Sequence, residues 1–104
     1  MDKELFLSLA QNVIVELEEK FSTHDFIKKF MKLHECAYIL WLNDILTNKA
    51  IKCGIFQEVH RQIGKYLAEH ANVLHIHQIM ADFESVDCFG DKDKISLWHK
   101  NLSL

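Results

Sequence analysis

The chain has 104 residues, a formal net charge of −3, no proline and 49% hydrophobic residues. This length supports one domain over residues 1–104, and the hydrophobic fraction excludes a disordered chain. A membrane-spanning helix is excluded because the sequence lacks about 18 consecutive apolar residues. The acidic balance excludes a domain that attracts nucleic acid by overall charge, so DNA binding would require a local basic patch.

The compartment is predicted from the first residues and from the cysteines. Met1 to Glu4 show neither the basic segment nor the apolar segment of a signal peptide. The three cysteines (Cys36, Cys53 and Cys88) are widely spaced and form no Cys-x-x-Cys pair. We therefore expect a cytoplasmic protein in a reducing environment.

Two amphipathic helices are predicted in the first third of the chain. Apolar residues at helical spacing predict the first helix over Asp2–Lys20, with Asp2 as its N-terminal cap. After a short apolar step, a second helix is expected to begin at Ser22 or Thr23, whose hydroxyls can accept from free backbone N–H groups. The polar face of the second helix carries three lysines: Lys28, Lys29 and Lys32.

Two further helices follow. The segment Cys36–Leu42 is apolar nearly all round, which predicts a helix buried in the core. This helix is expected to end near Asn48, or to continue to Gly54 as a left-handed C-terminal cap. The clearest helix spans Ile55–Glu69, where Gly64 costs about 1 kcal/mol relative to alanine and so favours a close helix crossing. Its apolar face is predicted to carry Phe56, Val59, Ile63, Tyr66 and Leu67, and its exposed face Gln57, Glu58, His60, Arg61, Gln62 and Lys65.

After Asn72 the apolar period changes from 3.6 to 2, which indicates extended structure. Alternating residues predict a β-hairpin formed by Glu84–Cys88 and Lys94–His99, joined by a charged loop. Leu74 and Ile76 also alternate with two histidines, and the last residues, Asn101 to Leu104, are expected to fray.

This order of elements is that of the winged helix-turn-helix superfamily. The segments that resemble small bacterial members of that superfamily are Phe21–Ile27, Phe56–Leu67, Glu84–Gly90 and Leu97–Lys100. The resemblance implies a mainly α fold with a small C-terminal antiparallel β-hairpin. It also implies DNA binding by the helix Phe56–Glu69, with the hairpin as the wing and Gly90–Lys94 as the wing tip. The sequence departs from the pattern because an apolar segment separates the two motif helices, which a tight motif joins by three or four residues.

The residue types on the predicted exposed face fit the contacts that such a helix makes. Gln57, Arg61 and Lys65 recur every four residues and form one stripe, with His60 beside it. Arginine and glutamine read guanine and adenine through paired hydrogen bonds in the major groove. Lys92 and Lys94 in the wing suit phosphate contacts, and the three lysines of the second helix add further backbone contacts. The leading hypothesis is therefore a double-stranded DNA-binding protein, such as a small transcriptional regulator or a mobile-element accessory protein.

Two other hypotheses remain open. Acidic residues on the long helix and in the wing (Glu58, Glu69, Asp91 and Asp93) reduce the attraction for phosphate and favour a protein-interaction or dimerisation module of the same fold. His75 and His77 on a strand would share one face, and Cys88 or His99 would complete a metal-dependent sensor site. The sequence shows no glycine-rich phosphate loop and no nucleophile elbow, so we expect neither an enzyme nor a cofactor.

Overall fold

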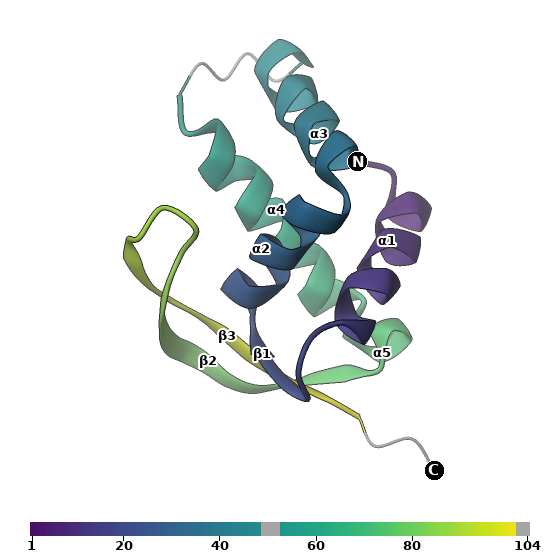
Figure 1. Cartoon of the computed structure of the whole chain (residues 1–104), viewed down its shortest axis with the longest axis vertical. Coiled ribbons are helices and arrows are strands. Elements are labelled where there is room, and N and C mark those ends of the chain that lie inside the picture. The colour runs from purple at the N-terminus through teal and green to yellow at the C-terminus, as the bar shows by residue number, and fades with distance from the viewer. Residues whose placement is uncertain (49–52, 102–104) are drawn as a thin grey trace.

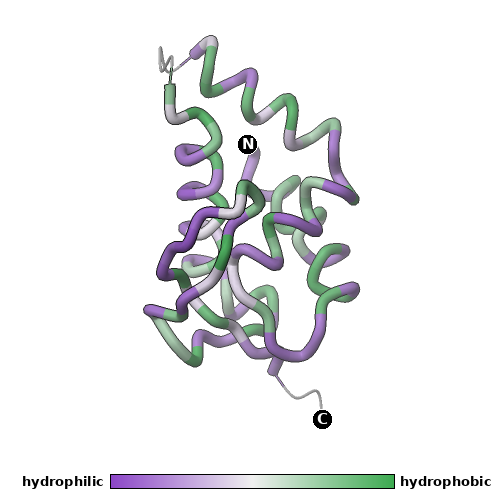
Figure 2. Tube along the Cα trace, turned by 60° about the vertical axis from the view of Figure 1, so that its left-hand side comes forward, coloured by the Kyte–Doolittle hydropathy of each residue, from purple (hydrophilic) through white to green (hydrophobic). Residues whose placement is uncertain are grey.

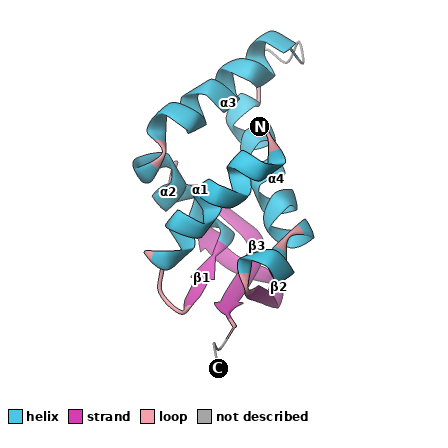
Figure 3. Cartoon of the chain, turned by 90° about the vertical axis from the view of Figure 1, so that its right-hand side faces the viewer, coloured by secondary structure: helices cyan, strands magenta, loops and turns pink. Residues whose placement is uncertain are grey.

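The computed structural model, which describes residues 1–48 and 53–101, has a helical N-terminal part interrupted by one short strand, and ends in a β-hairpin. In chain order, the elements are α1 (Lys3–Val15), β1 (Lys20–Ser22), α2 (Thr23–Leu33), α3 (Glu35–Asn48), α4 (Ile55–Glu69), α5 (Ala71–Leu74), β2 (Ile76–Val86) and β3 (Lys92–Lys100). The helices lie together above a small antiparallel sheet (Figures 1 and 3). The prediction of a mainly helical domain with a small antiparallel β element is confirmed. None of the described helices combines the length and apolar character that crossing a membrane requires.

The sheet has the strand order β1-β3-β2, so the first strand along the chain pairs with the last. Phe21 of β1 is opposite Trp98 of β3, and both side chains are buried in the core. The indole Nε1–H of Trp98 donates to Thr23 Oγ1 over 3.0 Å, which fastens the sheet to the first turn of α2. This long-range pairing places the hairpin beside α2 and α4 (Figure 1).

The hairpin is longer than the sequence predicts. Its first strand begins at Ile76 rather than at Glu84, and Cys88 lies outside the strand. Register shifts between Gln78 and Phe83 add unpaired residues to β2, and these interrupt the two-residue alternation that marks a strand in the sequence.

The turn of the hairpin, which we call the wing tip, also differs from its predicted position at Gly90–Lys94. The turn spans residues 87–91: the backbone N–H of Asp87 donates to the carbonyl oxygen of Asp91, and the Asp87 carboxylate accepts from the N–H groups of Phe89 and Asp91. Gly90 has a φ of +86°, which a glycine adopts without strain. Lys92 and Lys94 consequently belong to β3 rather than to the turn.

The predicted caps of the first two helices are confirmed. Asp2 accepts from the backbone N–H of Leu5, and Ser22 forms a reciprocal capping box with Asp25. α1 ends at Val15, well before the predicted Lys20. Its last turn carries no basic side chain, and the acidic residues that follow are unfavourable at the negative end of the helix dipole.

The prediction that the apolar segment Cys36–Leu42 is buried on all sides is wrong. α3 buries one stripe, formed by Tyr38, Trp41 and Ile45, against the other helices. The opposite face is open to solvent, with Ile39, Leu40 and Leu46 exposed by 53%, 67% and 47%. Figure 2 shows this hydrophobic helix at the edge of the molecule, and a helix in that position has only one face in contact with the core.

Aromatic side chains from several helices form the centre of the core. Phe6 of α1 lies next to Phe30 of α2, Trp41 of α3 and Tyr66 of α4, with ring centroids 4.9–6.1 Å apart. The indole Nε1–H of Trp41 donates to Gln62 on α4 over 2.9 Å. These contacts orient α4, the helix on which the predicted site depends.

The two glycines beside and within α4 have roles that differ from the predictions. Gly54 is left-handed, with a φ of +69°, but it precedes α4 instead of capping α3, which ends at Asn48. Residues 49–52 between them lie outside the described part. At Gly64 a Cβ atom would meet only Thr23 Cγ2, at an ordinary 3.8 Å, so no close helix crossing requires a glycine there.

The chain between α4 and the sheet turns sharply at His75. Leu74 belongs to the short helix α5 rather than to an extended segment, and His75 follows it in the left-handed region with a φ of +58°. The carbonyl oxygen of His75 accepts from the backbone N–H of Asn101 over 2.8 Å. Asn101 is therefore held in place rather than frayed, and residues 102–104 lie outside the described part.

Candidate nucleic-acid interface

The exposed side of α4 carries the predicted stripe. The buried residues Val59, Ile63 and Leu67 turn one side of the helix toward the core. On the other side, Gln57, Arg61, Lys65 and Ala68 are exposed, and we call these four residues the α4 ridge. The Arg61 and Lys65 side chains are 60% and 64% exposed. The structure thus brings three of the predicted site residues together on one accessible surface.

Both cations of the α4 ridge have an acidic neighbour on the same helix. The Arg61 guanidinium pairs with the Glu58 carboxylate, with 3.3 Å between Nε and Oε1. Its hydrogen bond and charge interaction with Glu58 raise the pKa of Arg61 above its ordinary value. Lys65 Nζ lies 3.8 Å from Glu69 Oε1. The side chains of both cations are more than half exposed, so both remain accessible to an anionic partner.

His60 does not belong to the exposed ridge, contrary to the prediction. Its Nε2 lies 2.7 Å from the hydroxyl oxygen of Tyr38 on α3, and its ring stacks against Phe89 of the wing tip. Phe89 also meets Phe56 edge to face, with ring centroids 5.0 Å apart. Burial lowers the pKa of His60, and the nearby Asp87 carboxylate partly opposes this shift. These contacts hold the wing tip against the beginning of α4.

A groove of about 380 Å³ lies between α2, α4 and the hairpin. Gln57 and Arg61 line it from α4, and Asp87 and Asp93 line it from the hairpin. His24 lines it from α2, is 7% exposed, and has no hydrogen-bond partner for Nδ1. Burial lowers the pKa of His24, against the opposing effect of the two aspartates. The hairpin therefore turns negative charge toward the flank of the α4 ridge.

The two predicted wing lysines do not line this groove. From β3, the groove is lined by Asp93, Ile95 and Ser96, and Lys92 and Lys94 are exposed on either side of Asp93 in the chain. Lys94 is paired in register with Glu84, which is also exposed. The predicted site is therefore divided between the α4 ridge and the hairpin.

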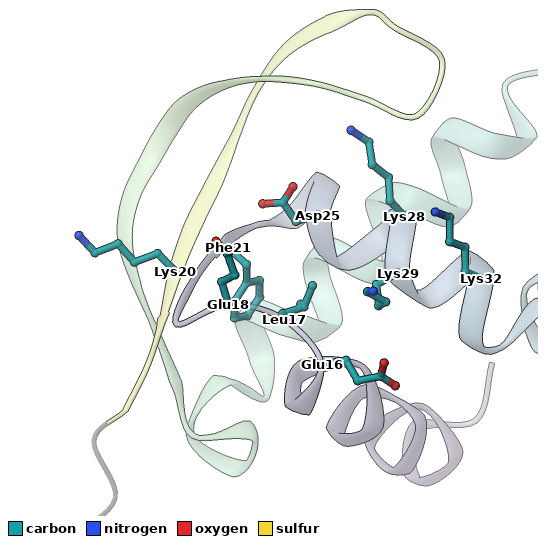
Figure 4. Close-up of a pocket in the computed structure, with 9 residues that line it drawn as sticks. All are labelled: Glu16, Leu17, Glu18, Lys20, Phe21, Asp25, Lys28, Lys29 and Lys32. Carbon is teal, nitrogen blue, oxygen red and sulfur yellow. The ribbon is translucent and has the colours of Figure 1, made fainter.

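The lysines of α2 border a third surface, which has mixed charge. Lys28, Lys29 and Lys32 line a groove of about 340 Å³ between α1, β1 and α2 (Figure 4). The same groove is lined by the carboxylates of Glu16, Glu18 and Asp25. Among the described residues, none of the three lysine amines has a carboxylate oxygen within 4.0 Å, the distance limit of an ion pair. Figure 4 shows Lys28 pointing toward the hairpin and Lys20 pointing to the other side, away from α2.

The sequence does not predict the contacts that hold the hairpin turn against α4. Tyr38, His60 and Phe89 are far apart in the chain, and no local pattern links them. The predicted pair of His75 and His77 on one strand face is also wrong, because His75 lies in the left-handed turn before β2. Instead, His77 lies beside His99, with ring centroids 5.4 Å apart.

Comparisons with known proteins give no match for this chain. No protein-family model matches the chain, and neither a curated protein nor a solved structure matches it.

Proposed function

We propose that the protein is a winged-helix DNA-binding protein whose α4 ridge enters the major groove. Two features of the fold support the winged-helix assignment. The helix of interest directly precedes the C-terminal hairpin, apart from the single turn of α5. The short strand β1 between α1 and α2 pairs with β3 of the hairpin. The helix α3 is an additional element between α2 and α4.

The observation that carries the proposal is the α4 ridge itself. Gln57, Arg61 and Lys65 extend along the solvent side of a 15-residue helix, over about 12 Å at 1.5 Å per residue. Ala68 continues this side with a small side chain, which allows close approach of a partner. Arginine and glutamine at such positions present the paired donors and acceptors that guanine and adenine require.

The acidic neighbours of the ridge are compatible with this role. When Arg61 turns toward a base or a phosphate, Glu58 keeps the hydrogen bond that it accepts from the side-chain amide of Gln62. Asp87 and Asp93 disfavour a phosphate inside the groove, so the DNA is expected to follow the ridge rather than to enter the groove. Lys92 and Lys94, which are exposed on β3, then contact a backbone that passes along the hairpin.

The exposed face of α3 favours a second candidate, a protein-interaction module of the same fold. Ile39, Leu40 and Leu46 leave apolar surface in water on one side of a helix. Adjacent exposed apolar side chains are typical of protein interfaces. This surface lies on a different helix from the α4 ridge, so the two candidate functions can be tested separately.

A random-duplex selection followed by binding titrations tests the DNA proposal. We expect a preferred site, and we expect Arg61→Ala to weaken it by roughly tenfold to a hundredfold. Lys20→Ala is the matched control, because it also removes one positive charge but lies on β1, away from α4. Absence of binding to the whole duplex pool at low salt would refute the DNA proposal, and sedimentation of the same sample would then test self-association.

A further inference from the structure

His77 and His99 are neighbours across the two strands of the hairpin, at its base. They are paired in register between β2 and β3, so their side chains share one face of the sheet. Trp98 is buried in the core, and the adjacent His99 therefore lies on the outer face. The two imidazole rings have centroids 5.4 Å apart and an interplanar angle of 43°.

Each ring has a side-chain oxygen beside one of its two nitrogens, and for His77 this contact is a hydrogen bond. Nδ1 of His77 lies 2.6 Å from Oδ1 of Asn101, and Nε2 of His99 lies 3.3 Å from Oε1 of Glu19. An imidazole that donates one N–H to an oxygen leaves its second nitrogen as an acceptor. The same arrangement orients the histidine ligands of metal sites, where a carbonyl or carboxylate outside the coordination shell accepts from the other ring nitrogen.

Backbone hydrogen bonds also fix Asn101 and Glu19, the residues that supply these two oxygen atoms. Asn101 donates its N–H to the carbonyl oxygen of His75, and the carbonyl oxygen of Glu19 accepts from the N–H of Lys100 over 2.9 Å. Both partners of the histidines are thus attached to the sheet that carries the rings. A cavity open to solvent adjoins the pair and is lined by His77, His99, Ile79 and Asn101, together with Lys20 and Lys100.

We propose that His77 and His99 form a two-histidine chelate for a divalent transition-metal ion, of the class of Ni²⁺, Cu²⁺ or Zn²⁺. Neutral imidazole suits these ions, and metal–nitrogen bonds of about 2.0–2.1 Å bring two ligating nitrogens to roughly 3 Å from each other. The two ring centroids are 5.4 Å apart, a distance at which one nitrogen of each ring can face the same ion. No set of three or more His, Cys, Asp or Glu side chains in the described part is arranged to hold an ion, so solution ligands complete the shell.

The charges around the pair both oppose and support a cation. Lys20 is paired in register with His99 and disfavours a positive ion. Lys100 directs its ammonium to the carbonyl oxygen of Leu17, at 2.6 Å, and is thereby occupied. The Glu19 carboxylate beside His99 supplies negative charge on the same side of the sheet. This site does not depend on DNA binding, because none of its residues belongs to the α4 ridge.

The test is a calorimetric titration of tag-free protein with NiCl₂ alone, in parallel with imidazole signals followed by NMR. We expect one ion per chain and simultaneous shifts of the His77 and His99 signals. His77→Ala and His99→Ala should each weaken binding at least tenfold, and Asn101→Ala by about tenfold through loss of ring orientation. Circular dichroism confirms that each variant is folded, and the exposure of His77 favours this outcome.

The matched control is His75→Asn, which removes a nearby imidazole and retains a residue that tolerates the left-handed region. This variant should bind Ni²⁺ as tightly as the unchanged protein. The proposal is overturned if the unchanged protein binds no Ni²⁺ at millimolar concentration. It is equally overturned if His77→Ala binds as tightly as the unchanged protein, because the ion would then be held elsewhere.

Discussion

The hydroxyl oxygen of Tyr38 lies 2.7 Å from Nε2 of His60, and this contact joins α3 to α4 beneath the wing tip. The His60 ring also stacks with Phe89, which in turn packs on Phe56. The beginning of α4, the additional helix α3 and the hairpin therefore meet at one point. Changes at this point are expected to alter both stability and the position of the wing.

Tyr38→Phe removes the hydroxyl and leaves the ring in place. We expect a loss of about 1–2 kcal/mol in the free energy of unfolding, because His60 is left partly buried without this partner. Urea unfolding followed by circular dichroism measures the loss. Tyr66→Phe is the control, because its hydroxyl donates to the carbonyl oxygen of Met1 at the chain end, where water can replace it. Equal losses in the two variants would contradict the assigned role of Tyr38.

The stability of the fold is expected to fall as the pH is lowered below about 6.5. Burial lowers the pKa values of His24 and His60 from the ordinary value of 6.5 in the folded protein. Between the folded and unfolded pKa values the unfolded chain binds more protons, so acidification favours unfolding. Asp87, whose pKa is also lowered from 3.8, contributes only at more acidic pH.

Unfolding free energies at pH 7.5 and 5.5 test this expectation, with His24→Gln and His60→Gln as the informative variants. Each variant should show a weaker dependence on pH than the unchanged protein, because one titrating group is removed. A pH dependence that remains unchanged in both variants would assign the effect to other groups.

Gly64→Ala is expected to stabilise the protein by about 0.5–1 kcal/mol, because alanine is the better helix former. The added Cβ would meet Thr23 Cγ2 at 3.8 Å, an ordinary contact distance. Thermal unfolding of the two proteins measures the difference. A lower melting temperature for the variant would show that the groove beside α4 cannot accept a methyl group.

Lys92→Ala should affect DNA binding differently from Arg61→Ala. Lys92 is exposed at the start of β3, outside the α4 ridge, and under the DNA proposal it would contact phosphates rather than bases. We expect Lys92→Ala to weaken binding to all duplexes alike and to reduce the slope of log affinity against log salt concentration by about one. Anisotropy titrations at several salt concentrations measure this slope. An unchanged slope would show that the DNA does not contact Lys92.

Substitutions on α3 distinguish its two faces. Leu40 is 67% exposed and its neighbour Trp41 is 2% exposed. Leu40→Gln should change the free energy of unfolding by no more than about 0.5 kcal/mol, whereas Trp41→Ala should cost about 3–5 kcal/mol. Urea unfolding of the monomer provides both values. A large loss for Leu40→Gln in a self-associated sample would instead indicate that this face is covered by a second copy.

The local sequence determined the helix starts and the long helix. Asp2 and Ser22 cap their helices through side-chain hydrogen bonds to N–H groups only three residues away, and the apolar period places α4 at Ile55–Glu69 without error. The exposed positions of Gln57, Arg61 and Lys65 follow from the same period. These features depend on residues that are close in the chain, so a single sequence contains the information needed to predict them.

Only the tertiary structure decided which faces of the other helices and strands are buried and which are exposed to solvent. The apolar segment Cys36–Leu42 was expected in the core, but α3 lies at the edge of the molecule and packs with one face. His60 was expected in solvent, but Tyr38 and Phe89, far away in the chain, enclose it. His77 pairs with His99 rather than with His75, because strand register overrides proximity in sequence. Burial and pairing between distant segments depend on the packing of the whole chain, which local spacing does not specify.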